Sequence, residues 1–209
     1  MGLVIFFRKR ANVNRFRDIL IGSMSLGVGN KALLCSGFFQ ELFKNHPYQA
    51  STEQNLSAVL VNHSIELTTI GIHNNCWMPS YKSFRNSLRS AGVNLRAMYT
   101  AKFHWHAKVF ILRHSNDPVL AIVGSSNITR NAFSDSDPFN YEADVIMWLD
   151  AIKPLTKFIE RNVTEIRDEP HEVIIADYDP KKNNDLLIKD RLIRLDTEMK
   201  ELELKELPE

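Results

Sequence analysis

The sequence predicts a layered α/β domain with a mixed β-sheet, followed by a charged C-terminal helix. Runs of apolar and β-branched residues of strand length alternate with segments whose apolar residues have helical spacing. The chain of 209 residues suffices for one sizeable domain with an appendage. Its fractions of hydrophobic residues (44%) and charged residues (24%) are ordinary for a globular protein. We therefore expect a domain over residues 1–180 and a helical tail over 181–209.

The individual elements follow from local composition and from helix and turn signals. Pro79 suits a helix start, and Gly92 suits a helix stop. In order, we expect a strand or an arm at 1–10, a helix ending near Gly27, a strand at 31–39, a polar loop at 45–52, a short helix at 53–60, a strand at 65–72, a helix at 79–91, a strand at 93–99, a strand at 141–148, a helix at 153–163 and a strand at 171–178.

A β-hairpin over residues 103–127 carries the polar residues of greatest interest. Its two apolar strands are joined by turn formers at 114–118. Because side chains alternate along a strand, His106 and Lys108 share one face and form a cationic pair that suits a phosphate group. His104 shares that face, and we expect it to be a packed or rim residue. Gly124-Ser125-Ser126-Asn127 ends the second strand and predicts a helix N-terminus, a second anion-binding feature.

Three short segments together resemble the HKD motif of the phospholipase D superfamily. They are His106-x-Lys108, Gly124-Ser125-x-Asn127 and Asn140-Tyr141-Glu142-Ala143, within a region of about a quarter of the chain. The sequence departs from the family pattern at Arg113, where the family usually has Asp. The nearest acid is Asp117, in the turn, and the spacing to Gly124 is longer than usual. The resemblance implies a layered α/β/α sandwich with a central mixed β-sheet.

The resemblance also implies a phosphodiesterase mechanism. A neutral imidazole nitrogen of His106 is the expected nucleophile, giving a phosphohistidine intermediate. Lys108 and Asn127, with help from Ser125, are expected to hold the phosphoryl oxygens where negative charge develops. Glu142 is expected to hydrogen-bond an imidazole nitrogen and so to fix its tautomer. We expect neither a metal nor another cofactor.

The single motif predicts a homodimer. One histidine cannot easily act both as the nucleophile and as the acid that protonates the leaving oxygen. In the family that the sequence resembles, two motifs form one active site, and single-motif members pair about a two-fold axis. We therefore expect His106 of two chains to meet at one phosphate.

Charge distribution favours nucleic acid as the substrate. Residues 1–149 hold 15 Lys and Arg against 9 Asp and Glu, a balance of +6, whereas residues 150–209 have a balance of −5. The motif thus lies in the basic part, and a DNA endonuclease is favoured, with DNA preferred over RNA. Ser126 and the stripe Lys82, Arg85 and Arg89 are candidate substrate-binding residues, although such a stripe is also typical of a solvated helix face.

Two other functions remain open from the sequence. One is a hydrolase or transferase acting on phospholipids or other phosphodiesters. The other is a non-catalytic nucleic-acid-binding protein, which the departure at Arg113 keeps open.

The tail and the cysteines complete the predictions. Five apolar residues spaced 4, 3, 4 and 3 form a short coiled-coil seam that pairs two chains, binds a partner protein or packs on its own domain: Ile188, Leu192, Leu195, Met199 and Leu202.

Cys35 and Cys76 are expected to be reduced thiols, so we expect a cytoplasmic protein. No apolar run approaches the ~20 residues of a membrane span, so we expect no membrane association.

Overall fold

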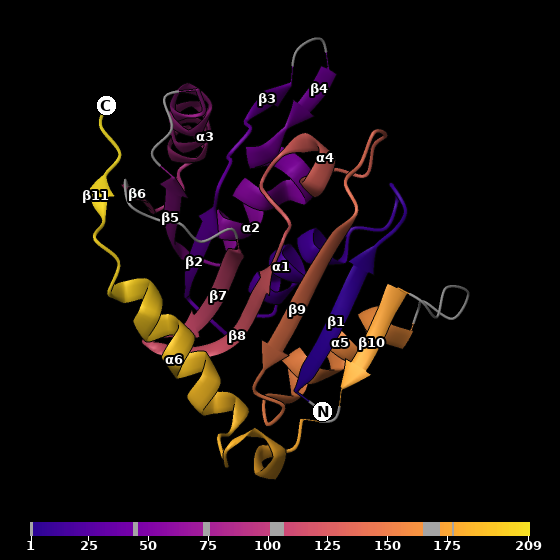
Figure 1. Ribbon diagram of the computed structural model, residues 1–209. Helices are drawn as coiled ribbons and strands as arrows, with labels where there is room; N and C mark the ends of the chain where they lie inside the picture. The colour runs from indigo at the N-terminus through magenta and orange to yellow at the C-terminus, as the bar shows by residue number, and fades with distance from the viewer. Residues whose placement is uncertain (1, 44–45, 73–75, 101–106, 165–171, 177) are drawn as a thin grey trace.

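A mixed β-sheet of nine strands forms the centre of the part of the chain that the structure describes, and helices lie on both of its faces (Figure 1). This computed structural model describes residues 2–43, 46–72, 76–100, 107–164, 172–176 and 178–209. The strands are β1 (Leu3–Arg8), β2 (Lys31–Ser36), β3 (Leu42–Phe43), β4 (His46–Gln49), β5 (Glu66–Ile72), β6 (Leu95–Thr100), β7 (Lys108–His114), β8 (Asp117–Gly124), β9 (Glu142–Trp148), β10 (Val173–Ala176) and β11 (Lys205–Glu206). The helices are α1 (Arg15–Ser25), α2 (Leu56–Asn62), α3 (Met78–Ser90), α4 (Arg130–Phe133), α5 (Lys153–Thr164) and α6 (Ile188–Lys200), with 3₁₀ turns η1 (Ala50–Asn55) and η3 (Pro180–Asn183).

The strand order is β10-β1-β9-β8-β7-β2-β5-β6-β11. Strands β2, β5 and β6 run parallel to one another, and the other neighbouring pairs are antiparallel. The predicted mixed sheet and the predicted hairpin, β7 with β8, are therefore confirmed. Of the two alternatives for the first residues, the structure has the strand, because β1 pairs with both β9 and β10.

The hydrophobic core forms two layers, one on each face of the sheet. The larger layer lies beneath α1, α2, α3 and α5 and includes Phe16, Leu60, Phe84 and Ile159. The smaller layer lies beneath α6, which crosses the front of the sheet in Figure 1. Because both faces of β7 and β8 are covered, these strands are continuous buried apolar runs, as central strands should be. Within the described residues, no helix is both long and apolar enough to cross a membrane.

The predicted coiled-coil seam faces the protein's own sheet. Leu192, Leu195 and Met199 are buried in the smaller layer, and Ile188 and Leu202 pack against it. Of the alternatives for the seam, the structure therefore has the intramolecular one.

Arg113, where the sequence departs from the motif that it resembles, helps to hold α6 on the sheet. Its Nε lies 2.6 Å from Asp196 Oδ1, and its Nη2 contacts the same oxygen. Lys200 Nζ lies 2.6 Å from the other oxygen of Asp196. Arg113 and Asp196 are almost fully buried. Because bulk water does not solvate their charges, each charge is compensated by the other in the ion pair.

Two local predictions are wrong. Residues 45–52 are not a polar loop as far as the structure describes them, because 46–49 form β4 and 50–55 form η1. The reason is the buried Glu41, which accepts hydrogen bonds from the Ser51 hydroxyl (2.6 Å) and from Gln49 Nε2 (2.8 Å) and so folds this polar segment back. The chain after Gly124 does not enter a helix directly either. The chain bends at Ser125, Ile128 forms an isolated bridge with Phe39, and α4 begins only at Arg130 and has four residues.

Candidate phosphate-binding site

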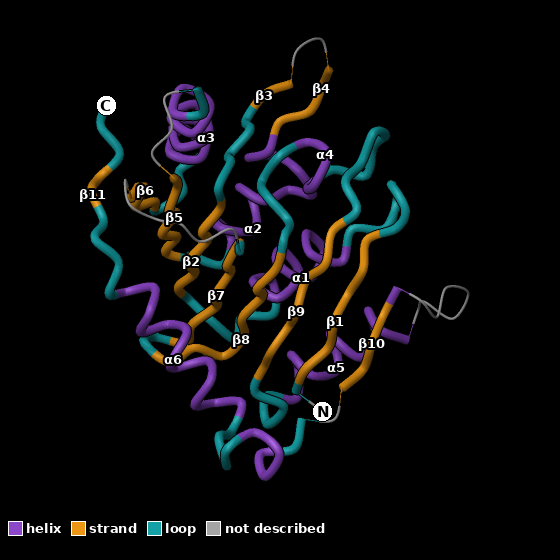
Figure 2. Tube along the Cα trace, in the orientation of Figure 1, coloured by secondary structure: helices purple, strands orange, loops and turns teal. Residues whose placement is uncertain are grey.

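Polar residues gather at one end of the sheet, where β2 and β8 end and where β7 and β9 begin. The register places Lys108 opposite Gly124, and Gly124 opposite Asp144. Ser125, one residue after Gly124, and Glu142, two residues before Asp144, therefore lie at the same edge. Figure 2 shows loops following the strands at this end of the molecule. His104 and His106 lie outside the described residues, four and two positions before Lys108.

Ser125 and Glu142 are joined directly. The Ser125 hydroxyl donates a short hydrogen bond to Glu142 Oε2, and Asn140 Nδ2 donates to Glu142 Oε1 at 3.1 Å. The Ala143 amide donates to the Ser125 hydroxyl at 3.0 Å, which fixes the rotamer of the serine. Glu142 is 8% exposed, and each of its two carboxylate oxygens accepts one of these hydrogen bonds, so the carboxylate has a fixed orientation. A buried anion with a fixed orientation is suited to orient an imidazolium or an ammonium group.

Asn127 is oriented by residues about 90 positions earlier in the chain. Its Oδ1 lies 3.2 Å from the hydroxyl of Ser36 and accepts from the amide of Phe38 at 3.3 Å. The Ser36 hydroxyl also accepts from the Ile128 amide at 3.2 Å, which ties β2 to the segment after β8. Since the oxygen of the Asn127 amide is directed to these donors, its Nδ2 group is the end that can donate to a phosphoryl oxygen.

Gly124 is required because the backbone and Asp144 approach it closely. A Cβ atom at this position would lie 2.0 Å from Asp144 Oδ1 and 2.5 Å from the Ala143 carbonyl oxygen. Below the glycine, the Ser126 hydroxyl donates to Asp144 Oδ2 at 2.7 Å. Ser126, a predicted substrate-binding residue, is 1% exposed, so its hydroxyl supports the site from below.

Lys108 brings positive charge to this edge. Burial raises the pKa of Asp144 to about 6, while hydrogen bonds from Ser126 and the charge of Lys108 act in the opposite direction. Burial likewise raises the pKa of Cys35 to about 12, and Lys108 again opposes the shift. Lys108 therefore acts on groups of both β9 and β2, and its register opposite Gly124 places it at the same edge as Ser125 and Glu142.

The basic stripe of α3 has different partners. Arg85, which is 2% exposed, donates to the carbonyl oxygens of Leu207 (3.1 Å) and Pro208 (2.9 Å). Lys82 donates to the Glu209 carbonyl oxygen at 2.6 Å, and Arg89 lies 3.4 Å from the Glu209 carboxylate. These three predicted substrate-binding residues of α3 thus contact the segment that follows β11. They do not contact Ser125 or Glu142 through any of these interactions.

Two buried residues of the site, Ser36 and Asp144, do not stand out in the sequence. Ser36 is the last residue of the buried strand β2, and its only signal is the Gly that comes next. Asp144 lies two residues after Glu142, so strand alternation places both carboxylates on one face. The alternation is readable from the sequence, whereas the contacts of Asp144 with Ser126 and Gly124 are not.

Comparison with known proteins gives likeness at the level of structure only. No family model matches the sequence, and no curated protein matches it. A phospholipase D family member, Nuc from Salmonella typhimurium, is similar over 78% of this chain and 92% of its own, with 16% identity and a TM-score of 0.48. Phosphatidylserine synthase from Haemophilus influenzae is similar over 96% of this chain and 48% of its own, with 14% identity and a TM-score of 0.49. Yeast tyrosyl-DNA phosphodiesterase is similar over 70% of this chain and 47% of its own, with 14% identity and a TM-score of 0.46.

Proposed function

We propose that the protein is a metal-independent phosphodiesterase, an endonuclease that cleaves DNA through a phosphohistidine at a site shared by two chains. The observation that supports this proposal is that Lys108, Ser125, Asn127 and Glu142 all belong to the edge of the sheet where β7 begins and β8 ends. A cation, a hydroxyl, an amide and a fixed carboxylate are the groups that phosphoryl transfer by an imidazole requires.

In the proposed first step, the neutral imidazole of His106 attacks phosphorus and the bond to the leaving oxygen breaks. The His106 imidazolium of the second chain gives its proton to that oxygen. Lys108 and the Asn127 amide group balance the charge that builds up on the non-bridging oxygens. In the second step, water attacks phosphorus, the P–N bond breaks and releases the neutral imidazole of the first His106, and the now neutral second imidazole accepts the water proton.

The departure at Arg113 bears on the attachment of α6 rather than on this chemistry. Arg113 is five residues along β7 from Lys108, about 17 Å at the usual rise per strand residue. Its contacts are with Asp196 on α6. Arg113, the departure that keeps a non-catalytic function open, therefore lies far from the proposed phosphate site.

The test is cleavage of labelled single- and double-stranded DNA in EDTA. We expect wild type to cut and His106→Ala to lose activity at least about a thousandfold, as expected for loss of a nucleophile. His114→Ala is the matched control, because His114 is an exposed histidine at the opposite end of β7. Equal cutting by wild type and His106→Ala contradicts the proposal. Turnover of phosphatidylglycerol vesicles without DNA cleavage supports the phospholipid alternative instead.

A further inference from the structure

Two pairs of aromatic side chains flank the phosphate-binding edge. Phe38 and Trp77 have ring centroids 4.5 Å apart with an interplanar angle of 46°. Phe139 and Tyr141 have centroids 5.4 Å apart with an angle of 45°. Tyr141 is 78% exposed, and the other three rings are partly exposed. Large exposed rings beside a polar site favour contact with a ligand that has flat apolar faces.

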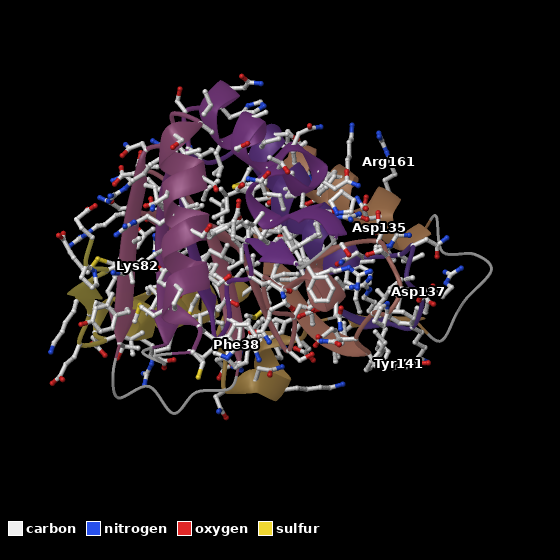
Figure 3. All side chains as sticks on the ribbon, turned by 90° about the horizontal axis from the view of Figure 1, so that it is seen from above. Phe38, Lys82, Asp135, Asp137, Tyr141 and Arg161 are labelled. Atoms are coloured by element: carbon white, nitrogen blue, oxygen red, sulfur yellow. The ribbon has the colours of Figure 1, made fainter. Side chains whose placement is uncertain are left out.

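Strand order places the site between these pairs. Phe38 follows β2 and Tyr141 precedes β9, while β7 and β8 lie between those two strands. Three strand spacings separate β2 from β9, about 14 Å in total. Figure 3, seen from above, labels Phe38 and Tyr141 at separate points along the lower part of the view.

Each pair is connected to a site residue. The Phe38 amide donates to the Oδ1 of Asn127, so this ring is one residue's backbone away from the proposed phosphate donor. Tyr141 lies between Asn140 and Glu142, whose side chains are hydrogen-bonded to each other. A ligand whose phosphate is held by Asn127 and Lys108 therefore has a ring within reach on either side.

Both pairs have rigid support. The Arg8 guanidinium lies 5.3 Å from the centroid of the Phe139 ring and donates to the carbonyl oxygens of Ala11 (2.9 Å) and Ser134 (2.6 Å). On the other side, Phe39 stacks on the buried Tyr81 at 4.5 Å and so anchors the backbone next to Phe38. Rings that are held in place lose little conformational entropy when a ligand stacks on them.

Positive charge accompanies the Tyr141 side as well. Phe7 pairs with Ala143 in the sheet, and the exposed Lys9 has its ammonium 6.0 Å from the centroid of the Phe7 ring. Together with Lys108, this gives cations beside the rings along the same edge. Alternating phosphates and unpaired bases match such a combination of cations and aromatic rings.

We propose that Phe38–Trp77 and Phe139–Tyr141 are stacking platforms for unpaired bases, and that the substrate is single-stranded nucleic acid. This inference rests on the proposed phosphodiesterase function. A duplex keeps its bases stacked inside, so its bases cannot lie on these rings. A single strand exposes them and stacks with about 1–3 kcal/mol per base.

The test compares the binding of a fluorescent oligothymidylate with that of a duplex of equal length. All proteins carry His106→Ala so that neither probe is cut. We expect Tyr141→Ala and Trp77→Ala each to weaken single-strand binding at least fivefold, while Tyr141→Phe and Trp77→Phe retain most of it. Duplex binding should change less than twofold. Tyr178→Ala is the matched control, because Tyr178 lies beside Leu186 at the other end of the sheet, and it should leave single-strand binding unchanged.

Three results would overturn the proposal that these rings stack on bases. The first is unchanged single-strand binding in both alanine variants, and the second is equal weakening of duplex binding. The third is that Tyr141→Ala weakens binding to phosphatidylglycerol vesicles but not to the single strand. A separate assay tests the proposed phosphodiesterase function. It measures hydrolysis of bis(p-nitrophenyl) phosphate, a diester without bases, and equal hydrolysis by wild type and His106→Ala would contradict that function. The binding measurement stays informative in that case, because it does not depend on turnover.

Discussion

The Nε atom of Arg113 lies 2.6 Å from Asp196 Oδ1, so a buried ion pair joins the central hairpin to α6. Removing one partner of a buried pair costs about 3–5 kcal/mol, and because Lys200 still pairs with Asp196, the loss of Arg113 should cost the lower figure, about 3 kcal/mol. We expect Arg113→Met to lower the free energy of unfolding by this amount in urea denaturation. Arg113→Asp should cost more because it places a second carboxylate against Asp196.

The double variant Arg113→Met/Asp196→Leu provides the control for the ion pair, since it removes both charges and should recover most of the loss. A second comparison is Arg194→Ala, which breaks only the exposed pair with Glu198 and should cost less than about 1 kcal/mol. Equal losses for Arg113→Met and Arg194→Ala would contradict a stabilising role of the buried pair.

Asp144 predicts a pH dependence of stability. Its pKa is about 6 in the fold, against an ordinary 3.8, so the folded protein binds the proton more tightly than the unfolded chain does. This group's contribution to stability therefore falls as pH rises from about 4 to about 6, by up to about 3 kcal/mol. Asp144→Asn cannot ionise. The stability of the variant minus that of wild type should accordingly increase through this window in denaturation series, and a difference that is independent of pH would rule the shift out.

Gly124→Ala should disturb both stability and chemistry. The added Cβ meets the Ala143 carbonyl oxygen at 2.5 Å, so the backbone of β8 or β9 has to move. We expect a loss of about 2–3 kcal/mol in thermal unfolding, together with a large decrease in DNA cleavage as Ser125 shifts. Gly27→Ala is the comparison, because its Cβ meets nothing within 4 Å and it pays only the cost of a positive φ, about 1–2 kcal/mol.

The proposed site shared by two chains predicts that one intact histidine per dimer is insufficient. Wild-type and His106→Ala chains with different tags are co-expressed, and the mixed dimer is purified through both tags. We expect its activity to be near that of the His106→Ala homodimer, and sedimentation equilibrium should give the mass of two chains. A mixed dimer with half of the wild-type activity, or a fully active monomer, would show that each chain works alone.

Much of the sheet was predictable because local composition decides it. The β-branched run in β5 and the apolar runs in β7 and β8 form strands wherever they are buried. The segment around β4 was not predictable in the same way, because its polar residues are ordered by Glu41, which lies outside it. The same holds for Arg85, whose carbonyl partners are more than 120 residues away.

For the candidate site, the motif segments identified the edge but not its supports. Glu142 and Ser125 carry the resemblance, and the structure joins them by a hydrogen bond. The role of Ser36 depends on a contact across 91 residues, and no local pattern encodes such a contact. Predictions for Lys82 and Arg89 came from helical spacing alone, which says where a stripe lies on a helix but not what covers it.

The strand order also has a consequence for synthesis on the ribosome. Both outermost strands, β10 and β11, come from residues beyond 172, whereas the strands they border are made much earlier. Until that late part of the chain emerges, β1 and β6 each present unpaired backbone groups. The nascent protein therefore passes through a stage in which both edge strands of its sheet are unpaired. At that stage the edges can pair with other unfinished chains, which favours aggregation.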